Sequence, residues 1–439
     1  MKTYHSSYYN FYLSENDKFL VFNSITGSIS NITEKLFYSI KDNSINTRDP
    51  GFNFLLKCGY ITTCNSLEEE RSKAIQYYSD AINKRILQLT IIVTGQCNLR
   101  CVYCYEHFDK GKMDLETQEE IILYLENALP NYESLYVTWF GGEPLTALDI
   151  IESLSAKIQG LCTTLGKNYT ASITTNGVFL TPKVHSILDR CNVKSYQITL
   201  DGDKKTHDKQ RITPTGKGSY DRIYNNLLAM KSSTFQHHIT IRINIAHNNV
   251  FNKDFQHFFN CLYSDFGQDR RFNLHLAAVS DLEGTEGGSI DICDTGYLFP
   301  YYIFAQNAGF GFSHYKILFK PLHLVCYAAN PNAFVIDSNG TIRKCTVALY
   351  DVQNNLGYLK DGKMVLNREK EILWNQEKSH ENPVCASCEL LPTCFGKFCP
   401  LENIQKKIVA CPPMEKNLAM YMKLFLGEGT ENINYTRIK

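Results

Sequence analysis

"TGQCNLRCVYCYEHFD", residues 94–109, places three cysteines between a strand-like run and a helix-like segment. Three arrangements could account for thiols so close together. They could form one disulfide with a thiol left over, a zinc site that takes a further ligand, or an iron–sulfur cluster held by only three protein ligands. The rest of the sequence distinguishes among these arrangements.

The composition favours an ordinary globular protein of the cytoplasm. The chain has 439 residues, of which 44% are hydrophobic, and it contains 45 Lys and Arg against 45 Asp and Glu. This balance leaves no basic footprint for nucleic acid. The N-terminal segment has no apolar signal region and no run is long enough to cross a bilayer, so we expect neither a nucleic-acid nor a membrane partner.

The sixteen cysteines are distributed unevenly. Because disulfides are rare in the cytosol, clustered cysteines there indicate metal ligands. Three lie at 97–104 and seven lie between Cys326 and Cys411. The remaining six are scattered, and we interpret them as small buried hydrophobic residues. They are Cys58, Cys64, Cys162, Cys191, Cys261 and Cys293.

Residues 86–280 alternate between apolar runs and helix-like stretches. Parallel strands need helical crossovers, so six successive β/α units predict an α/β fold with a partial (β/α)6 barrel. The expected strands are 87–95, 134–142, 170–177, 195–202, 238–246 and 272–280. The expected helices are 116–128, 148–165, 181–190, 219–232 and 252–266.

Further units flank this barrel. Residues 1–85 contain "KFLVFNSITGSISNIT", two expected strands joined at a Thr-Gly turn, followed by the short helix "EKLFYSIKD". Residues 281–325 form a bridge rich in glycine and aromatic residues. Residues 326–415 are cysteine-rich with little periodicity, so we expect them to need metal to fold, and 416–439 form a tail.

The first three cysteines directly follow the first expected strand, at the carboxyl edge where sites of such barrels collect. A cubane [4Fe–4S] cluster takes one thiolate at each iron. Three thiolates would therefore leave one iron open to a small molecule. Zinc in a closed structural site would need a fourth protein ligand, and His107 is the nearby candidate.

"CNLRCVYC" resembles the CxxxCxxC signature of radical S-adenosylmethionine (SAM) enzymes, with Tyr103 as the aromatic residue before the last cysteine. The resemblance implies that Cys97, Cys101 and Cys104 hold a [4Fe–4S] cluster. Its open iron would chelate SAM, and one electron would cleave SAM to a 5′-deoxyadenosyl radical.

Motifs at the ends of the next strands resemble the SAM pocket of that family. "WFGGEP" resembles the GGE motif, in which Gly141, Gly142 and Glu143 would receive the methionine amino group. "TTNG" places Thr175 and Asn176 on the same edge. "TLDG" with "THDKQR" resembles SxDG…HDxxR, with Thr199 in place of serine and Arg211 as the partner of the SAM carboxylate.

The later cysteines resemble the SPASM domain of radical SAM enzymes that modify peptides. The resemblance implies two auxiliary [4Fe–4S] clusters, and thus three clusters in all. One would be held by Cys326, Cys345 and Cys399, and the other by Cys385, Cys388, Cys394 and Cys411. A zinc ribbon of Cys385, Cys388, Cys394 and Cys399 is the alternative, which leaves the flanking cysteines unexplained.

Two departures separate the chain from anaerobic sulfatase-maturating enzymes. In those enzymes an Asp directly after the cysteine that matches Cys345 acts as the catalytic base. This chain has Thr346 at that position, and threonine cannot act as such a base. They also carry an additional cysteine, and none lies between 327 and 344. Both differences weaken a sulfatase-type function without removing it as an alternative.

Residues 1–85 resemble the winged-helix-like leader-recognition unit of SPASM peptide maturases. Such units bind a leader by strand addition at a sheet edge. We therefore expect a cytoplasmic enzyme that crosslinks a ribosomal precursor peptide through a thioether or carbon–carbon bond. A flavodoxin- or ferredoxin-type reductase would supply electrons. A zinc-stapled peptide-binding module without catalysis is the alternative from another class.

Overall fold

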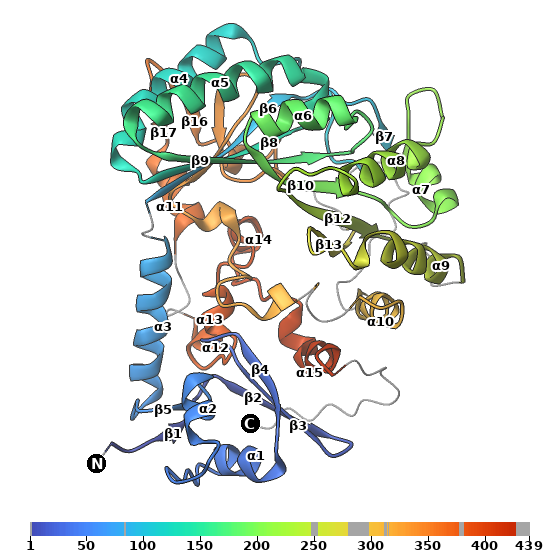
Figure 1. The fold of residues 1–439 in the computed structure, drawn as a ribbon. Helices are drawn as coiled ribbons and strands as arrows, with labels where there is room; N and C mark the ends of the chain where they lie inside the picture. The colour runs from blue at the N-terminus through green and yellow to red at the C-terminus, as the bar shows by residue number, and fades with distance from the viewer. Residues whose placement is uncertain are drawn as a thin grey trace. The chain divides into compact units, whose positions relative to one another are not determined.

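The computed structural model describes residues 2–82, 85–246, 253–279, 298–310, 314, 316–376 and 382–426. The chain divides into two compact units, each taken by itself below (Figure 1). The first comprises residues 1–83, 311–329 and 375–439, and the second comprises residues 84–310 and 330–374. Residues 281–297, 311–313 and 315 of the predicted bridge and residues 427–439 of the C-terminal tail lie outside the described residues.

The second unit is built on a ten-stranded sheet. Its strand order is β13-β12-β10-β9-β8-β6-β14-β15-β16-β17. The first six strands in this order are parallel and correspond to the six predicted from the sequence, so the predicted α/β partial-barrel fold is confirmed. They are β6 (Ile86–Thr94), β8 (Ser134–Gly141), β9 (Asn168–Thr175), β10 (Val193–Thr199), β12 (His238–Ile245) and β13 (Phe272–Ala278).

The crossover helices pack on one face of this sheet (Figure 1). They are α4 (Leu115–Ala128), α5 (Leu148–Leu165), α6 (Pro182–Arg190), α8 (Tyr220–Lys231) and α9 (Lys253–Leu262). Alternate strand residues explain the packing, because side chains two apart share a face. On β6, Leu87, Leu89, Ile91 and Val93 are all buried. The intervening positions carry Gln88 and Thr90, which keep some exposure.

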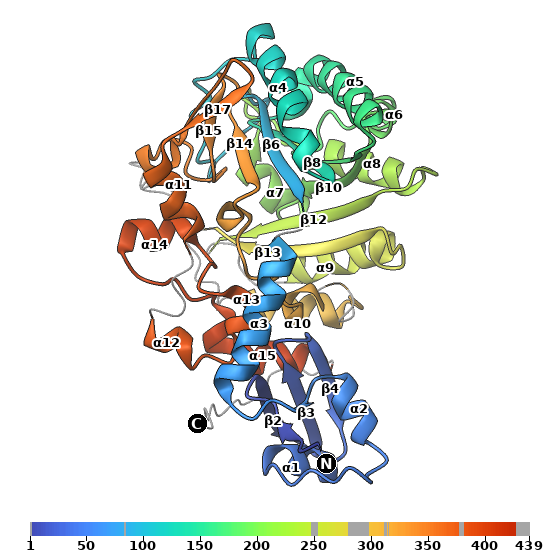
Figure 2. The same ribbon diagram turned by 90° about the vertical axis from the view of Figure 1, so that its left-hand side faces the viewer.

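Four strands from the cysteine-rich region extend the sheet beyond β6. β14 (Ala333–Ile336) pairs in parallel with β6 and becomes a seventh parallel strand (Figure 2). β15 (Thr341–Arg343), β16 (Gly357–Lys360) and β17 (Lys363–Leu366) follow as antiparallel neighbours. Sequence reasoning treated this region as lacking regular structure because each strand is only three or four residues long.

The first unit contains the antiparallel sheet β2-β3-β4. β3 (Lys18–Asn23) and β4 (Ser28–Ile32) are the predicted pair, β2 (Asn10–Glu15) adds a strand, and α1 (Glu34–Lys41) is the predicted helix. Its other elements are β1 (His5–Ser6), α2 (Phe52–Lys57), β5 (Ile61–Thr62), α3 (Leu67–Ile82), α12 (Pro383–Ala386), α13 (Leu391–Cys394), α14 (Pro400–Lys406) and α15 (Met414–Leu424).

Residues from both ends of the chain share one core in this unit. Tyr9, Ala74 and Tyr78 pack with Cys385, Leu391 and Phe395. The rings of Tyr78 and Phe395 stack with their centroids 4.5 Å apart. The N-terminal segment therefore contributes to the environment of a C-terminal cysteine.

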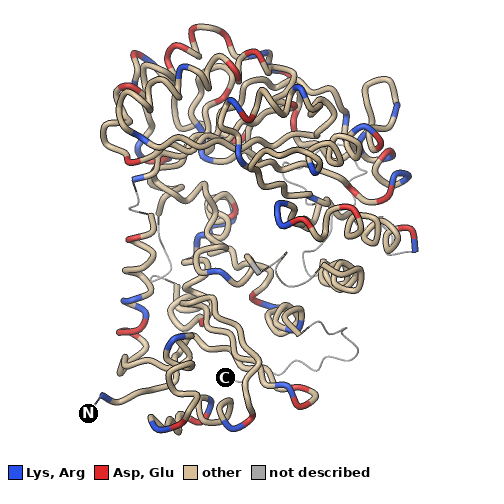
Figure 3. Tube along the Cα trace, in the orientation of Figure 1, with Lys and Arg blue, Asp and Glu red and all other residues tan. Residues whose placement is uncertain are grey.

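Lys and Arg are interspersed with Asp and Glu along the trace (Figure 3). In the described ranges, no helix combines the length and the apolar character needed to cross a bilayer.

Candidate functional site

The cysteine loop is fastened by a short two-stranded sheet at the carboxyl edge of β6. β7 (Arg100–Cys101) pairs with β11 (Arg211–Ile212), so that Arg211 lies opposite Cys101. The Val102 N–H donates to the Gln210 carbonyl at 2.9 Å. The predicted pocket residue Arg211 thus holds the cysteine loop through its own backbone, although the two segments are far apart in sequence.

The three thiols of this loop lie close enough to affect one another. Burial raises the pKa of Cys97 and Cys104 to about 12, and the charges of the neighbouring thiols add to the shift. The Leu99 N–H and the Asn176 amide nitrogen both point at the Cys97 sulfur, at 3.4 and 3.8 Å. N–H donors of this kind stabilise a thiolate, which is the form that an iron cluster takes as a ligand.

The thiols do not form a single-ion site. Nowhere in the described ranges do three or more His, Cys, Asp or Glu side chains converge as the ligands of one metal ion. A four-iron cluster makes a different demand, because each thiolate binds its own iron.

Gly141 and Gly142 hold the segment that leads into Cys97. Gly141 has a φ of +137°, and a Cβ there would lie 2.1 Å from the Thr94 carbonyl oxygen. A Cβ on Gly142 would lie 2.7 Å from the Gln96 carbonyl oxygen. The Gly142 N–H donates to Thr94 at 3.1 Å. Only glycine lets the end of β8 approach the cysteine loop this closely.

Glu143 joins the carboxyl ends of β8 and β9. Its completely buried carboxylate accepts hydrogen bonds from the Leu145 N–H at 3.0 Å, the Thr175 hydroxyl at 2.7 Å and the Asn176 N–H at 2.7 Å. Burial raises the pKa of Glu143, and these three bonds act in the opposite direction. The Asn176 side chain also donates to Asn98 in the cysteine loop at 2.7 Å. Three predicted residues, Glu143, Thr175 and Asn176, are therefore in contact.

A second buried network surrounds the hydroxyl of Tyr103. This hydroxyl donates to Asp201 and accepts from Arg211 Nη1 at 2.7 Å and from Asn244 Nδ2 at 3.1 Å. Asp201 also accepts from the Asn244 N–H at 2.8 Å and lies 3.7 Å from Arg211 Nη1. Burial raises the pKa of Asp201, while the Arg211 charge lowers it. The predicted residues Tyr103 and Arg211 are thus in direct contact.

One nitrogen of this network is unsatisfied. Arg211 Nε is buried and has no hydrogen-bond partner among the described residues. Arginine is always charged and donates through five N–H groups, so an anionic ligand would complete its shell. A carboxylate such as that of SAM fits this orphaned donor.

His207, in the HDxxR-like motif, supports the network around the Tyr103 hydroxyl by hydrogen bonds that reach the backbone. The Asp201 N–H donates to His207 Nδ1 at 3.1 Å, and His207 Nε2 is hydrogen-bonded to the Ser219 hydroxyl at 3.0 Å. That hydroxyl donates to the Arg211 carbonyl at 2.8 Å. The predicted residue Thr199 is buried at the end of β10, two residues before Asp201.

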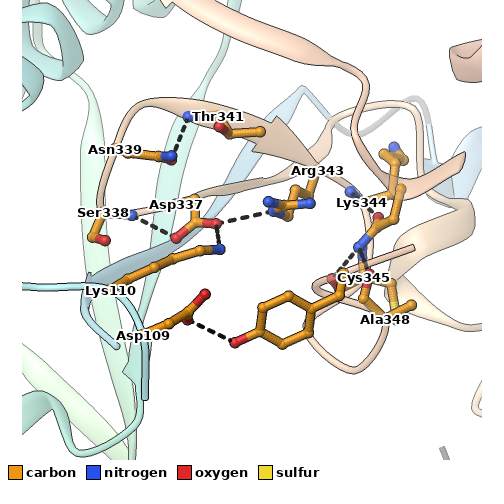
Figure 4. Close-up of polar contacts among 12 residues, drawn as sticks. Asp109, Lys110, Asp337, Ser338, Asn339, Thr341, Arg343, Lys344, Cys345 and Ala348 are labelled. Atoms are coloured by element: carbon orange, nitrogen blue, oxygen red, sulfur yellow. Dashed lines mark hydrogen bonds and ion pairs between the residues drawn. The ribbon is translucent and has the colours of Figure 1, made fainter. Parts of the chain in front are cut away.

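The segment after the cysteines is pinned to the β14–β15 hairpin by a buried ion cluster (Figure 4). Asp337 directly follows β14 and accepts from Lys110 Nζ at 2.6 Å and from Arg343 Nε at 3.0 Å. The Tyr350 hydroxyl donates to Asp109 at 3.0 Å. The hairpin leads to Cys345, so this cluster ties the first cysteine group to a later cysteine.

Sequence reasoning assigned no site role to several residues that complete these networks. Asn98, Asp337 and Asn244 belong to this group, as does Arg242 on β12, whose Nε donates to Asn244 Oδ1 at 2.8 Å. In the sequence, Arg242 and Asn244 stand out only as two of the polar residues that alternate with isoleucine along β12.

The C-terminal cysteines fall in both units. Cys345, in the second unit, is buried and its sulfur accepts from the Val347 N–H at 3.4 Å. In the first unit, the Cys326 N–H donates to the Lys397 carbonyl at 2.9 Å. Cys399, in the same unit, is partly buried. The joint site predicted for Cys326, Cys345 and Cys399 stays a prediction.

The four cysteines of the second predicted auxiliary set all lie in the first unit. Burial raises the pKa of Cys394 to about 12 and that of Cys388 to about 11. Both thiols also feel the charges of Cys385 and Cys411, so the four sulfurs are near one another. Cys97, Cys101 and Cys104 are not joined by a disulfide, so the disulfide explanation of the opening stretch is excluded.

The fold and the cysteine loop define a class of protein. Residues 91–261 match the family model of the Radical SAM superfamily. Residues 91–261 are therefore a radical SAM domain, as the cysteine motif predicted, and over almost its whole length the chain is similar to a radical SAM enzyme. Members of the superfamily use SAM and a [4Fe–4S] cluster.

Particular relatives place the chain within that class. It is 23% identical to the radical SAM cyclopropyl synthase TigE of Paramaledivibacter caminithermalis, over 96% of this chain and 94% of that protein. It is 29% identical to the GTP 3′,8-cyclase of Clostridium perfringens strain 13, over 40% of this chain and only 51% of the cyclase. The structure of anSMEcpe with bound AdoMet and Cp18Cys peptide has the same fold, with a TM-score of 0.57, 16% identity and coverage of 78% of this chain and 96% of that one.

Proposed function

We propose that this enzyme modifies a ribosomally synthesised peptide by forming a thioether or a carbon–carbon crosslink. The observation that carries the proposal is the cysteine loop, anchored at the carboxyl edge of the barrel beside two buried polar networks. The relative that spans the chain is named a cyclopropyl synthase, which favours carbon–carbon bond formation. A solved structure of similar fold contains a bound peptide, which favours a peptide substrate.

The residues at the barrel edge suit SAM and an iron–sulfur cluster. Cys97, Cys101 and Cys104 would hold the cluster, and the orphaned Arg211 Nε would receive the SAM carboxylate. Glu143, Thr175 and Asn176 would position the methionine amino group, with Gly141 and Gly142 allowing the close approach. When bound, the cluster and SAM supply the 5′-deoxyadenosyl radical that abstracts hydrogen from the substrate.

The remaining cysteines would hold two auxiliary clusters. Cys385, Cys388, Cys394 and Cys411 supply four thiolates for one, whereas Cys326, Cys345 and Cys399 supply three for the other. Closing a new bond on a carbon radical releases one electron. We infer that these cysteines would hold clusters able to accept this electron and that a flavodoxin- or ferredoxin-type reductase would provide the electron that starts the reaction.

Removing the first three cysteines tests the central assignment. Three cubane clusters predict roughly 12 irons per chain. Changing Cys97, Cys101 and Cys104 together to Ala should remove about a third of the iron and all SAM cleavage. The matched control changes Cys58, Cys162 and Cys191 to Ala, which should leave iron and cleavage unchanged. SAM cleavage that survives the first triple change would overturn the assignment.

The edge strands β2 and β4 of the N-terminal sheet are our candidates for leader binding, because an extended peptide can add to an open sheet edge. Deleting residues 1–85 would be a poor test, since Tyr9 and Tyr78 share a core with Cys385. Hydrogen exchange avoids this difficulty. Adding precursor peptide should protect backbone amides in Asn10–Glu15 or Ser28–Ile32, whereas leaderless core peptide should not. Equal exchange in both cases would mean that the leader binds elsewhere.

A further inference from the structure

Over β9, β10 and β12 the inner wall of the barrel is polar and almost without fixed charge. Strand residues that alternate with the helix-covered apolar positions share the opposite face of the sheet. On that face the Thr138 and Ser172 hydroxyls are hydrogen-bonded at 2.9 Å, and Gln197 and Thr240 lie side by side on β10 and β12. Among the positions that the six parallel strands give to this face in the described ranges, Arg242 is the sole Lys, Arg, Asp or Glu.

Arg242 feels the charge of Asp201 but makes no close ion pair with a carboxylate among the described residues. Within those residues its hydrogen bond runs from Nε to Asn244 Oδ1. The nearby carboxylate Asp201 is engaged by Tyr103 and Arg211. Removing part of the water around a guanidinium without adding a carboxylate ligand costs free energy, because arginine stays charged. Consistent with this cost, burial lowers the pKa of Arg242.

The guanidinium is held ready for a ligand. Asn244 Oδ1 accepts a hydrogen bond from Arg242 Nε, and Asn244 Nδ2 donates one to the Tyr103 hydroxyl. Asn244 therefore fixes the position of the arginine relative to the cysteine loop. Across the sheet Arg242 lies between Thr199 and His275. The residue is only partly buried, and neither Nη atom is enclosed. Both Nη groups can therefore donate to one carboxylate in the bidentate geometry that arginine favours.

We propose that Arg242 binds the side-chain carboxylate of an Asp or Glu residue in the substrate peptide. The inference rests on the proposed peptide substrate and adds a specificity determinant to it. The carboxylate of SAM has its own candidate donor in Arg211 Nε. Arg242 lies deeper in the barrel than Asn244, on a neutral polar wall, so it suits an acidic side chain inserted from the barrel mouth.

Two fluorescent heptapeptide pools test this inference on the holoenzyme with SAM bound. Both are acetylated and amidated, and they differ only in having Glu or Gln at the central position. A charge-assisted bidentate contact predicts that the Glu pool binds about tenfold or more tightly than the Gln pool. Arg242→Gln should abolish this preference when the variant is saturated with SAM. Arg222→Gln, on the exposed side of α8, is the matched control and should retain the preference.

Other outcomes would overturn the inference. Equal binding of the two pools by the unaltered enzyme would contradict a carboxylate site at Arg242. The proposal that the substrate is a peptide would still stand. Binding of neither pool would overturn the inference, whereas the peptide function itself is tested separately by the hydrogen exchange of precursor peptide. If Arg242→Gln binds SAM more weakly but keeps the preference for the Glu pool, Arg242 contributes to SAM binding and the inference is wrong. If Arg242→Gln does not fold, Arg242→Lys keeps the charge and should retain a reduced preference, and an undiminished preference would contradict the bidentate contact.

Discussion

One hydroxyl group, that of Tyr103, joins the cysteine loop to the ends of two strands. It contacts Asp201 beyond β10, Asn244 on β12 and Arg211 on β11. If only an aromatic ring were needed before the third cysteine, Phe would serve as well as Tyr. The hydroxyl has a separate task, since it satisfies polar groups that are buried with it.

Tyr103→Phe should destabilise the enzyme and weaken SAM binding. Removing the hydroxyl leaves buried partners unsatisfied, which costs about 1–3 kcal/mol in the free energy of unfolding. Because Arg211 loses an anchor, the SAM dissociation constant should rise roughly tenfold while iron content stays normal. Urea unfolding and calorimetric SAM titration measure the two effects. The control is Tyr196→Phe, since the Tyr196 hydroxyl is buried without a partner and its loss should change neither quantity.

Two buried histidines should make stability depend on pH. His185 and His237 are 2% and 3% exposed, and their rings meet with centroids 4.9 Å apart. Burial lowers the pKa of both, that of His237 to about 4. Below pH 6.5 these histidines are therefore protonated in the unfolded chain but still neutral in the folded chain. The free energy of unfolding is at its full value above pH 6.5 and decreases as the pH falls towards 4.

Urea unfolding between pH 7.5 and 4.5 measures this dependence. The unaltered enzyme should lose roughly 1–2 kcal/mol of unfolding free energy between pH 7 and pH 5 through His237. His237→Phe should flatten the profile, whereas substitution of the exposed His238 by Asn should not. A slope that is the same in all three proteins would show that other groups control it.

At the scale of elements, the site depends on how closely strand ends can approach. β8 ends in Gly141 and Gly142, whose backbones lie against Thr94 and Gln96 at the end of β6. Glu143 then reaches across to Asn176 after β9. The carboxyl ends of three parallel strands are thereby locked together directly beneath the cysteine loop.

Gly141→Ala should disrupt this junction. The new Cβ would meet the Thr94 carbonyl and the backbone would be strained at a φ of +137°, so we expect a loss of about 3 kcal/mol of unfolding free energy, together with a lower iron content. Gly160→Ala is the control, because Gly160 lies within α5 with open space around it. Alanine there should stabilise the protein by up to about 1 kcal/mol. Wild-type stability in Gly141→Ala would contradict the close approach.

At the scale of the whole molecule, the cysteine-rich region completes the sheet of the barrel. β14 covers the edge of β6, and β15, β16 and β17 continue the same sheet. The Asp337 cluster binds β14 to the segment after the first cysteines. The region from 330 to 374 therefore belongs to the same packed unit as the barrel.

Two fragments test this dependence. A fragment of residues 85–310 should expose β6 as an open edge and aggregate, because an unpaired hydrophobic edge strand recruits other chains. A fragment of residues 85–374 restores β14 to β17 and should be monomeric in size-exclusion chromatography. Equal solubility and equal melting temperatures of the two fragments would show that β14 is dispensable for the barrel.

Local patterns in the sequence were enough to predict the α/β fold and the radical SAM class. Strand and helix periods repeat over short distances, and "CNLRCVYC" carries its spacing within eight residues. These features are local because side-chain direction follows the backbone period. Because Glu143, Asn176 and Arg211 follow successive predicted strands, the sequence also predicted that they lie at the same edge of the sheet.

Only the tertiary structure decided which distant residues meet. Tyr103 pairs with Asp201 across 98 residues, and β14 pairs with β6 although most of the barrel separates them in sequence. Tyr9 shares a core with Cys385 for the same reason. Such pairings depend on strand register and on the burial of side chains from separate segments, neither of which leaves a periodic trace in the chain. The position of Arg242 likewise became visible only when the strand pairing placed it between Thr199 and His275, with the nearby Asp201 engaged by Tyr103 and Arg211.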